Sequence, residues 1–170
     1  VIGGGASGMA FAVALKQKRP DIEVTVFEKN PKVLKKILVT GNGRCNILNF
    51  DAVAENYFEA CEFVRPAVEK YAPKKTEAIF RDMGLLLMSE QEGRAYPISQ
   101  TAASVVCVLS SAAERAGVKV FTDTPVKSIK KSQGRFVINN DKSFDFAVIA
   151  CGGAAAPKQG TDGSSFELFK

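Results

Sequence analysis

The sequence predicts an α/β fold with a parallel sheet and a small β-meander. A glycine cluster, Gly3 to Gly8, lies between the β-branched remnant of a strand and an amphipathic helix. Farther along, strand-like and helix-like segments alternate, as in parallel sheets whose strands are joined by helices. Short strands with tight turns then follow between residues 126 and 146. With 170 residues, the chain is long enough to bury about 70% of its unfolded surface in a core.

The composition excludes several classes of function. Apolar residues make up 46% of the chain, but no apolar run approaches the ~20 residues of a membrane-spanning helix. We therefore expect a soluble, cytoplasmic protein with no membrane partner. The absence of histidine excludes a Ser/His/Asp triad, an HExxH zinc site and any histidine proton shuttle. The four cysteines form no CxxC pair, so we expect reduced thiols and no metal site.

The first part of the chain predicts a helix followed by a strand. The helix continues to Lys18, and Pro20-Asp21 then breaks it. Residues 23–27 form a short β-branched strand, and Asn30-Pro31 turns the chain. The run Gly41-Asn42-Gly43 prevents regular structure where it stands.

The middle of the chain predicts helices and then a hairpin. Residues 54–83 have helical character with interruptions at Pro66 and Pro73. A hairpin is expected around Glu92-Gly93.

The last third predicts the clearest helix and a series of strands. Residues 101–116 place apolar side chains on one stripe, and Gly117 follows as a C-terminal stop. Strands are expected at 118–122, 126–130, 136–139 and 144–151, with tight turns at Gln133-Gly134 and Asn140-Asp141.

The glycine cluster has the spacing Gly3-x-Gly5-x-x-Gly8 between strand and helix, which gives the motif its meaning. A side chain at the first glycine would obstruct the tight turn, one at the second would hold a pyrophosphate away, and one at the third would separate helix from strand. The N–H groups of Ala6 and Ser7 at the helix start would then bind phosphates. The alternative is a glycine turn with a purely structural role.

An acid stands at the expected distance from this turn. Glu28 ends the second strand, 20 positions after Gly8, where a carboxylate accepts hydrogen bonds from both ribose hydroxyls of an adenosine. An acid there repels a 2′-phosphate, so the predicted ligand is FAD or NAD rather than NADP. These residues do not separate FAD from NAD.

Positive charge is concentrated just after this acid. Lys29, Lys32, Lys35, Lys36 and Arg44 lie in one stretch without an acid, whereas the rest of the chain is balanced. One local cluster favours an anionic small ligand over nucleic acid, so we expect no nucleic-acid partner. The segment 35–46 suits phosphates or the polar edge of a flavin, and a solvated loop is the alternative. Asn46 would hydrogen-bond a ring amide or cap the loop.

Four motifs carry a resemblance to a known family. They are Val1-Ile2-Gly3-Gly4-Gly5-Ala6-Ser7-Gly8, Val39-Thr40-Gly41-Asn42-Gly43-Arg44-Cys45-Asn46, Gly93-Arg94-Ala95-Tyr96-Pro97, and Cys151-Gly152-Gly153 through Gly160-Thr161-Asp162-Gly163. Together they resemble the BaiN-like flavoproteins, also labelled NAD(P)/FAD-dependent oxidoreductases or aminoacetone-oxidase-like FAD-binding enzymes. The resemblance covers essentially the whole sequence.

The resemblance implies a Rossmann-like FAD-binding domain of the glutathione-reductase type. Residues 1–170 would be one FAD-binding domain, cut at both ends, without the inserted substrate-side domain and the C-terminal return segment. Two positions depart from the family pattern: Leu34 stands where a glycine is expected, and Cys151 stands where many relatives have threonine.

The resemblance also implies a set of cofactor-binding residues. These are Gly3, Gly5, Ala6, Ser7, Gly8, Glu28, Lys29, Lys36, Gly43, Arg44, Cys45, Asn46, Val126, Cys151, Gly152 and Asp162. The glycine turn would line the pyrophosphate, and the Lys36 to Asn46 stretch would run toward the flavin. Val126 would offer its backbone N–H and C=O to adenine, and residues 159–163 would approach the flavin.

The predicted function is therefore that of a flavin-dependent oxidoreductase acting on a small-molecule substrate, with NAD(P)H as a candidate electron donor. Arg44 is a hypothetical stabiliser of negative charge on the reduced flavin. No residue stands out as a general acid or base, and Cys45 is better explained as a packed small residue than as a redox thiol. An NAD-dependent dehydrogenase, a tRNA-modifying flavoprotein and a non-catalytic nucleotide-binding module are the alternatives. Substrate, catalytic residues and oligomeric state stay open.

Overall fold

A computed structural model describes residues 1–154, 157 and 161–169, with the side chains of Ala60 and Phe169 left aside. The chain divides into two compact units, which are described separately. Unit 1 comprises Val1–Ile37 and Ser110–Lys170, and unit 2 comprises Leu38–Leu109. The helix α4 (Ala102–Arg115) contributes residues to both.

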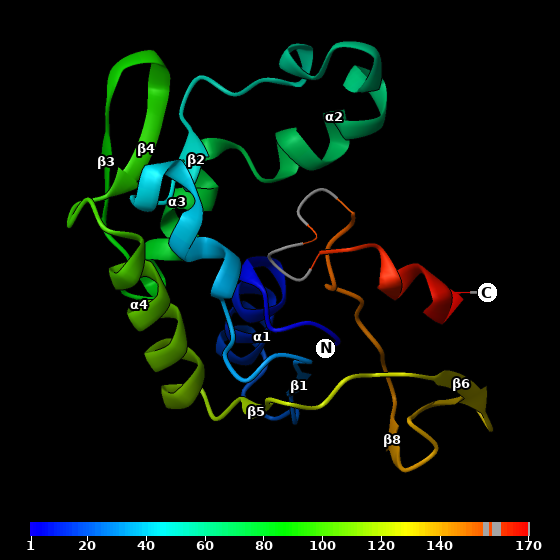
Figure 1. Ribbon diagram of the computed structural model, residues 1–170. Helices are drawn as coiled ribbons and strands as arrows, with labels where there is room; N and C mark the ends of the chain where they lie inside the picture. Colours follow the sequence, from blue (N-terminus) through cyan, green and yellow to red (C-terminus); the bar gives the residue numbers. More distant parts are fainter. Residues whose placement is uncertain (155–156, 158–160, 170) are drawn as a thin grey trace. The chain divides into compact units, whose positions relative to one another are not determined.

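Unit 1 is built on a small parallel sheet (Figure 1). Strand β1 (Thr25–Phe27) pairs in parallel with β5 (Lys119–Phe121). On the other side of β1, Ile2 forms parallel bridges to both Phe27 and Ile149. The spatial order is therefore Ile149, Ile2, β1, β5, so the chain continues first on one side of Ile2 and later on the other. The strand order thus reverses at Ile2. In open α/β sheets, ligands bind where the strand order reverses, outside the carboxyl ends of the strands.

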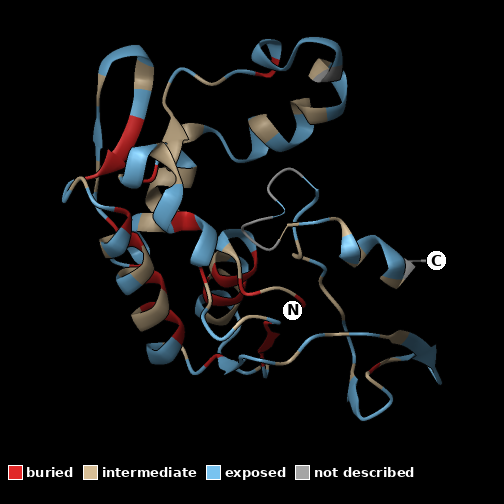
Figure 2. Cartoon of the chain, in the orientation of Figure 1, coloured by how far each residue is buried: buried red, intermediate tan, exposed pale blue. Residues whose placement is uncertain are grey.

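Helix α1 (Ala6–Lys18) connects Ile2 to β1 and buries one side against the sheet. Gly8, Met9, Ala12 and Val13 are its buried residues, with the spacing of a single helical face. Buried residues gather on β1, on this face of α1 and on α4 (Figure 2). The expected helix and strand are thus both present.

A three-stranded antiparallel meander completes the sheets of unit 1. Its strands are β6 (Ile129–Ser132), β7 (Arg135–Ile138) and β8 (Lys142–Phe144), in that spatial order. Residues 133–134 and 139–140 all have positive φ, the geometry of the tight hairpin turns that asparagine and glycine favour. The meander packs on the sheet through a cluster that contains Ile2, Phe27 and Ile138. The predicted α/β fold with a parallel sheet and a small meander is confirmed.

Unit 2 contains a second antiparallel sheet and two short helices. The sheet has the order β2 (Leu48–Asn49), β4 (Arg94–Pro97), β3 (Leu87–Ser89), so the predicted hairpin gains a third strand. The α3 helix (Pro73–Asp82) begins at the expected proline and contacts β2.

The predicted interruption at Pro66 is wrong, because this proline lies inside α2 (Cys61–Lys70). A proline removes one helical hydrogen bond without deciding where a helix ends. All residues of α2 are at least partly exposed, as Figure 2 shows.

The remaining short elements are 3₁₀ turns. They are η1 (Lys35–Val39), η2 (Gly41–Gly43), η3 (Ala54–Ala60), η4 (Gln91–Gly93) and η6 (Ser164–Phe169). Across residues 1–154, 157 and 161–169, no helix has both the length and the apolar character needed to cross a membrane.

Candidate cofactor site

Two glycines of the turn in unit 1 are required by packing alone. Gly3 has φ +107°, and a Cβ there would lie 2.5 Å from the carbonyl oxygen of Ala150. A Cβ on Gly8 would lie 2.0 Å from the carbonyl oxygen of Gly3. Both contacts are with main-chain atoms that cannot rotate away. These glycines therefore allow the helix, the turn and the segment that follows the bridge at Ile149 to come together.

Gly5 is different, because space is open around it. It is the N-cap of α1, and a Cβ there would meet no atom within 4 Å. Ala6 and Ser7 follow and are exposed. The first amides of a helix have no partner within the helix, and this first turn holds no acid. The helix start therefore presents free N–H groups and the positive end of the helix dipole to an open space, which suits an anion.

Glu28 lies beside this turn and is buried at the end of β1. Its Oε2 accepts the Gly4 N–H (2.8 Å), and its Oε1 accepts the backbone N–H (2.8 Å) and the side-chain amide (2.6 Å) of Asn30. A carboxylate offers about four acceptor sites, so about one remains, on Oε2. The prediction that Glu28 accepts both ribose hydroxyls requires the Asn30 amide to give up its bond.

Two of the predicted lysines contact the segment 161–164 within unit 1. Lys36 Nζ lies 3.3 Å from Thr161 Oγ1, and Lys29 Nζ lies 3.4 Å from Asp162 Oδ1. Hydrogen bonds from the Ser164 hydroxyl (2.6 Å) and N–H (3.1 Å) lower the pKa of Asp162 to about 2. Asp162 is therefore a firmly ionised partner for Lys29. Residues 158–160, which include the predicted Gln159, lie outside the described residues.

Cys151 and Gly152 follow the bridge at Ile149. The Cys151 thiol donates to the Ile2 carbonyl (3.3 Å), and burial raises its pKa. A threonine, the residue that the family resemblance leads us to expect here, would make the same kind of bond through its hydroxyl. Gly152 has φ +74°, and a Cβ there would lie 2.7 Å from Thr161 Cγ2.

Val126 directs its side chain inward and leaves its peptide groups open. The side chain packs against the cluster of Ile2, Phe27 and Ile138. Among the described residues, its N–H and C=O have no hydrogen-bond partner. The backbone on either side is instead held by Asn139, whose amide accepts from Lys127 N–H (2.7 Å) and donates to the Pro125 carbonyl (3.0 Å).

The predicted loop residues Gly43, Arg44, Cys45 and Asn46 belong to unit 2. The loop is a tight turn in which Thr40 O accepts the N–H groups of Gly43 (3.0 Å) and Cys45 (3.1 Å). Gly43 and Asn46 are exposed, and space is open around Gly43. Cys45 is buried, which raises the pKa of its thiol. The interpretation of Cys45 as a packed residue agrees with this burial.

Arg44 has its own partners within unit 2. Its Nη1 donates to Glu90 Oε1 (2.8 Å) and to Gln100 Oε1 (2.9 Å), and the guanidinium lies 4.0 Å from the centre of the Tyr96 ring. These partners are 46 to 56 positions away in sequence, so local patterns gave no signal for them. The predicted role of Arg44 at the flavin stays a prediction that competes with these contacts.

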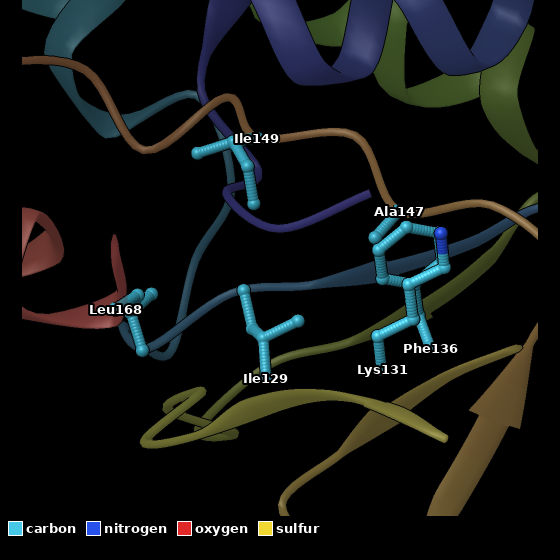
Figure 3. Close-up of a pocket in the computed structure, with 6 residues that line it drawn as sticks. All are labelled: Ile129, Lys131, Phe136, Ala147, Ile149 and Leu168. Atoms are coloured by element: carbon cyan, nitrogen blue, oxygen red, sulfur yellow. The ribbon is translucent and has the colours of Figure 1, made fainter. Parts of the chain in front are cut away.

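A shallow apolar pocket lies elsewhere in unit 1 (Figure 3). It is lined by Ile129, Lys131, Phe136, Ala147, Ile149 and Leu168. None of the predicted cofactor residues lines it, and its single polar side chain is a lysine. In the described part of the chain, acids and cysteines form no cluster that could hold a metal ion.

The strand order, the glycine turn and the buried acid together define a Rossmann-type domain with an open helix start. The family model described as "HI0933-like protein Rossmann domain" matches residues 1–170. The chain belongs to this family.

Two curated relatives extend this result. A 3-dehydro-bile acid delta(4,6)-reductase of Clostridium scindens is 38% identical over 174 residues, which cover the whole chain and 42% of that protein. A ribosomal RNA dihydrouridine synthase of Haemophilus influenzae is 25% identical over 176 residues, which cover 99% of the chain and 43% of that protein. The chain thus spans about two fifths of the length of these relatives. The family resemblance predicted from the sequence motifs is confirmed.

A solved structure supports the fold. The crystal structure of THI4 from Thermovibrio ammonificans matches 81% of this chain and 45% of its own, with a TM-score of 0.52 and 17% identity. At this identity the match concerns the fold alone.

Proposed function

We propose that this chain is the FAD-binding part of a flavin-dependent oxidoreductase. The observation that carries the proposal is the open start of α1. Gly5 leaves space for a ligand, the exposed residues Ala6 and Ser7 carry the first amides of the helix, and Glu28 accepts a hydrogen bond from the same turn. A pyrophosphate fits the amides, and one hydroxyl of an adenosine ribose fits the acceptor site that remains on Glu28 Oε2.

The residues present fit FAD along the rest of its adenosine half. The peptide groups of Val126 offer one donor and one acceptor, the pattern that the edge of an adenine ring requires. Cys151 and Gly152 stand where the chain re-enters the sheet beside Ile2. Lys29 and Lys36 contribute positive charge to the same unit. When bound, the isoalloxazine would supply hydride transfer, and the protein would supply position and electrostatics.

The relatives support a substrate class. The name of the Clostridium scindens protein describes the reduction of double bonds in an oxo bile acid, and that of the Haemophilus influenzae protein describes the formation of dihydrouridine. In both cases two hydrogens add across a carbon–carbon double bond that is conjugated with a carbonyl group. We propose this reaction for the present enzyme, on a small-molecule substrate and with NAD(P)H as the electron donor. Anaerobic reduction of the bound flavin by NADH or NADPH would test the donor.

Gly5→Ala tests the cofactor site. The added methyl group enters the space proposed for the pyrophosphate, and φ at this residue is −76°, which alanine adopts without strain. We expect FAD affinity to fall about tenfold or more. Alanine is a poorer N-cap than glycine, so the unfolding free energy without ligand should change by about 1 kcal/mol or less. Fluorescence titration with FAD and chemical denaturation measure the two quantities.

The outcomes separate the rival functions. A yellow wild-type protein with a flavin spectrum supports the proposal, whereas a colourless protein that binds NAD would favour an NAD-dependent dehydrogenase. A Gly5→Ala variant that binds FAD as tightly as the wild type would contradict the site. Flavin that binds but is reduced by no donor would favour a non-catalytic module.

A second candidate is the same reduction on a uracil ring in RNA. One relative carries a ribosomal RNA activity in its name. In addition, residues 126–146 of the meander hold five cationic side chains against two carboxylates, although charge outside positions 29–44 balances overall. Binding of ribosomal RNA fragments that weakens steeply with salt would favour this candidate. Binding that is absent at low salt would exclude it.

A further inference from the structure

In the segment that links β5 to the meander, one residue has an N–H and a C=O that both lack a hydrogen-bond partner among residues 1–154, 157 and 161–169. Within residues 125–128, Pro125 O, Lys127 N–H and Ser128 N–H all bond to the side chain of Asn139. Only Val126 stands between them with N–H and C=O groups that have no partner among the described residues. Its side chain packs against the cluster of Ile2, Phe27 and Ile138.

The position of Val126 relates it to the candidate cofactor site. Ile2 and Phe27 are followed directly by Gly3 and Glu28, the start of the glycine turn and the buried acid. The peptide groups of Val126 therefore belong to a residue packed on a cluster that includes the residues directly before the turn and the acid. A donor and an acceptor on one residue match a base edge with the opposite pair, such as N1 and the N6 amino group of adenine.

We call the hydrogen bonds from the Asn139 side chain to Pro125, Lys127 and Ser128 the Asn139 clamp. Asn139 is suited to this role for two reasons. Its φ is +53°, a left-handed conformation that asparagine adopts more readily than most residues. Its side-chain amide also combines a donor for Pro125 O with an acceptor for Lys127 and Ser128. Its own N–H donates to Ser128 O (3.0 Å), which fixes the distance between the turn and the linking segment.

We infer that Asn139 is a positioning residue, which holds Val126 so that its N–H and C=O bind the edge of the adenine ring of FAD. The inference rests on the proposed function, and it adds a specificity for adenine over bases with the reversed pattern. Asn139 does not touch the cofactor. It acts by fixing the peptide groups on both sides of Val126.

The experiment compares FAD with flavin hypoxanthine dinucleotide in the full protein. Hypoxanthine carries an N–H at position 1 and a carbonyl at position 6, which reverses the donor and acceptor of adenine. We expect the wild type to bind FAD about tenfold more tightly than the analogue, because a mismatched edge leaves polar groups unpaired. Asn139→Gly keeps the left-handed turn and removes the clamp, so it should bind both dinucleotides with similar affinity.

A matched control stands next to this residue. Asn140 has φ +57° in the same turn, and among the described residues its side chain makes no hydrogen bond. Asn140→Gly should therefore keep the wild-type preference for FAD. Asn139→Asp retains the acceptor and loses the donor, and it should retain part of the preference. It also provides a second measurement if Asn139→Gly does not fold.

The outcomes distinguish this inference from the proposed function. A wild type that binds both dinucleotides equally, or an Asn139→Gly variant with the full preference, would overturn the role of Asn139 while FAD binding stands. If neither Asn139 variant lost preference relative to Asn140→Gly, the clamp would likewise be rejected. A wild type that binds neither dinucleotide would overturn the proposed function and this inference with it.

Discussion

The glycine turn at Gly3–Gly8 and the loop at Gly41–Asn46 are both predicted to hold the cofactor, yet they are built in different ways. In the turn, the groups offered to a ligand are bare amides, and the glycines leave space around them. In the loop, the most conspicuous group is the Arg44 guanidinium, which is engaged by Glu90, Gln100 and Tyr96.

The turn and the loop differ in how far their ligand-binding groups can be predicted from neighbouring residues. A turn that works through main-chain groups needs only small residues at the right spacing, which the sequence displays directly. A charged side chain has a choice of partners, and those partners come from distant parts of the chain. The spacing of glycines therefore predicts a main-chain site directly, whereas the partners of a cation depend on contacts that only the folded chain brings together.

Gly8→Ala should have the largest effect and would break the turn. The new Cβ would lie 2.0 Å from the Gly3 carbonyl oxygen, so α1 must move away from the strand. Overpacking against main chain is expected to cost about 3 kcal/mol or more of unfolding free energy. Chemical denaturation measures the loss, and Gly5→Ala serves as the matched control in the same turn. Equal stability of the two variants would contradict the separate roles given to these glycines.

Leu34 provides a smaller test, because it replaces a residue that the family pattern expects to be glycine. It has φ +60°, it is buried, and its N–H donates to Gly4 O (2.8 Å), so it supports the turn from outside. A left-handed conformation costs an ordinary residue about 1–2 kcal/mol, whereas truncation of a buried leucine costs about 2–5 kcal/mol. The free energy that the buried Leu34 side chain contributes by packing is therefore larger than the cost of its left-handed backbone.

Two substitutions at Leu34 separate these terms. Leu34→Gly loses the packing and relieves the strain, so its unfolding free energy should fall by about 2 kcal/mol. Leu34→Ala loses packing and keeps the strain, and it should be about 1 kcal/mol less stable than Leu34→Gly. Denaturation of both variants checks this order. The reverse order would mean that the backbone at this position is not strained.

Local patterns predicted much of the fold. The helix after Gly8, the stop at Gly117 and the tight turn at Gln133-Gly134 each depend on a few neighbouring residues, and all are present. Pairings between segments that are distant in the sequence could not be predicted from local patterns. The pairing of Leu48 with Ala95 joins segments 47 positions apart, and the strained backbone of Leu34 has no signal in a leucine itself. The site follows the same rule, since the Asn139 clamp and the Arg44 partners are both long-range contacts.

Arg44→Ala is the test that decides how the loop differs from the turn. Removal of the guanidinium leaves Glu90 and Gln100 without a donor and takes a cation from the Tyr96 ring. Glu90 is 33% exposed, so solvent compensates part of the loss, and we expect unfolding free energy to fall by about 1–2 kcal/mol. Chemical denaturation of the protein without FAD measures this change.

The same variant also tests the alternative role at the flavin. If the contacts within unit 2 are what Arg44 provides, Arg44→Ala binds FAD and the flavin keeps its reduction potential, while stability falls. Arg44→Lys should recover less than half of the lost stability, because one ammonium group cannot reproduce the planar arrangement of donors over an aromatic ring. A variant with unchanged stability and a lowered flavin potential would instead assign Arg44 to the cofactor. In that case the loop and the turn would both act on the cofactor, the loop through a side chain and the turn through main-chain amides.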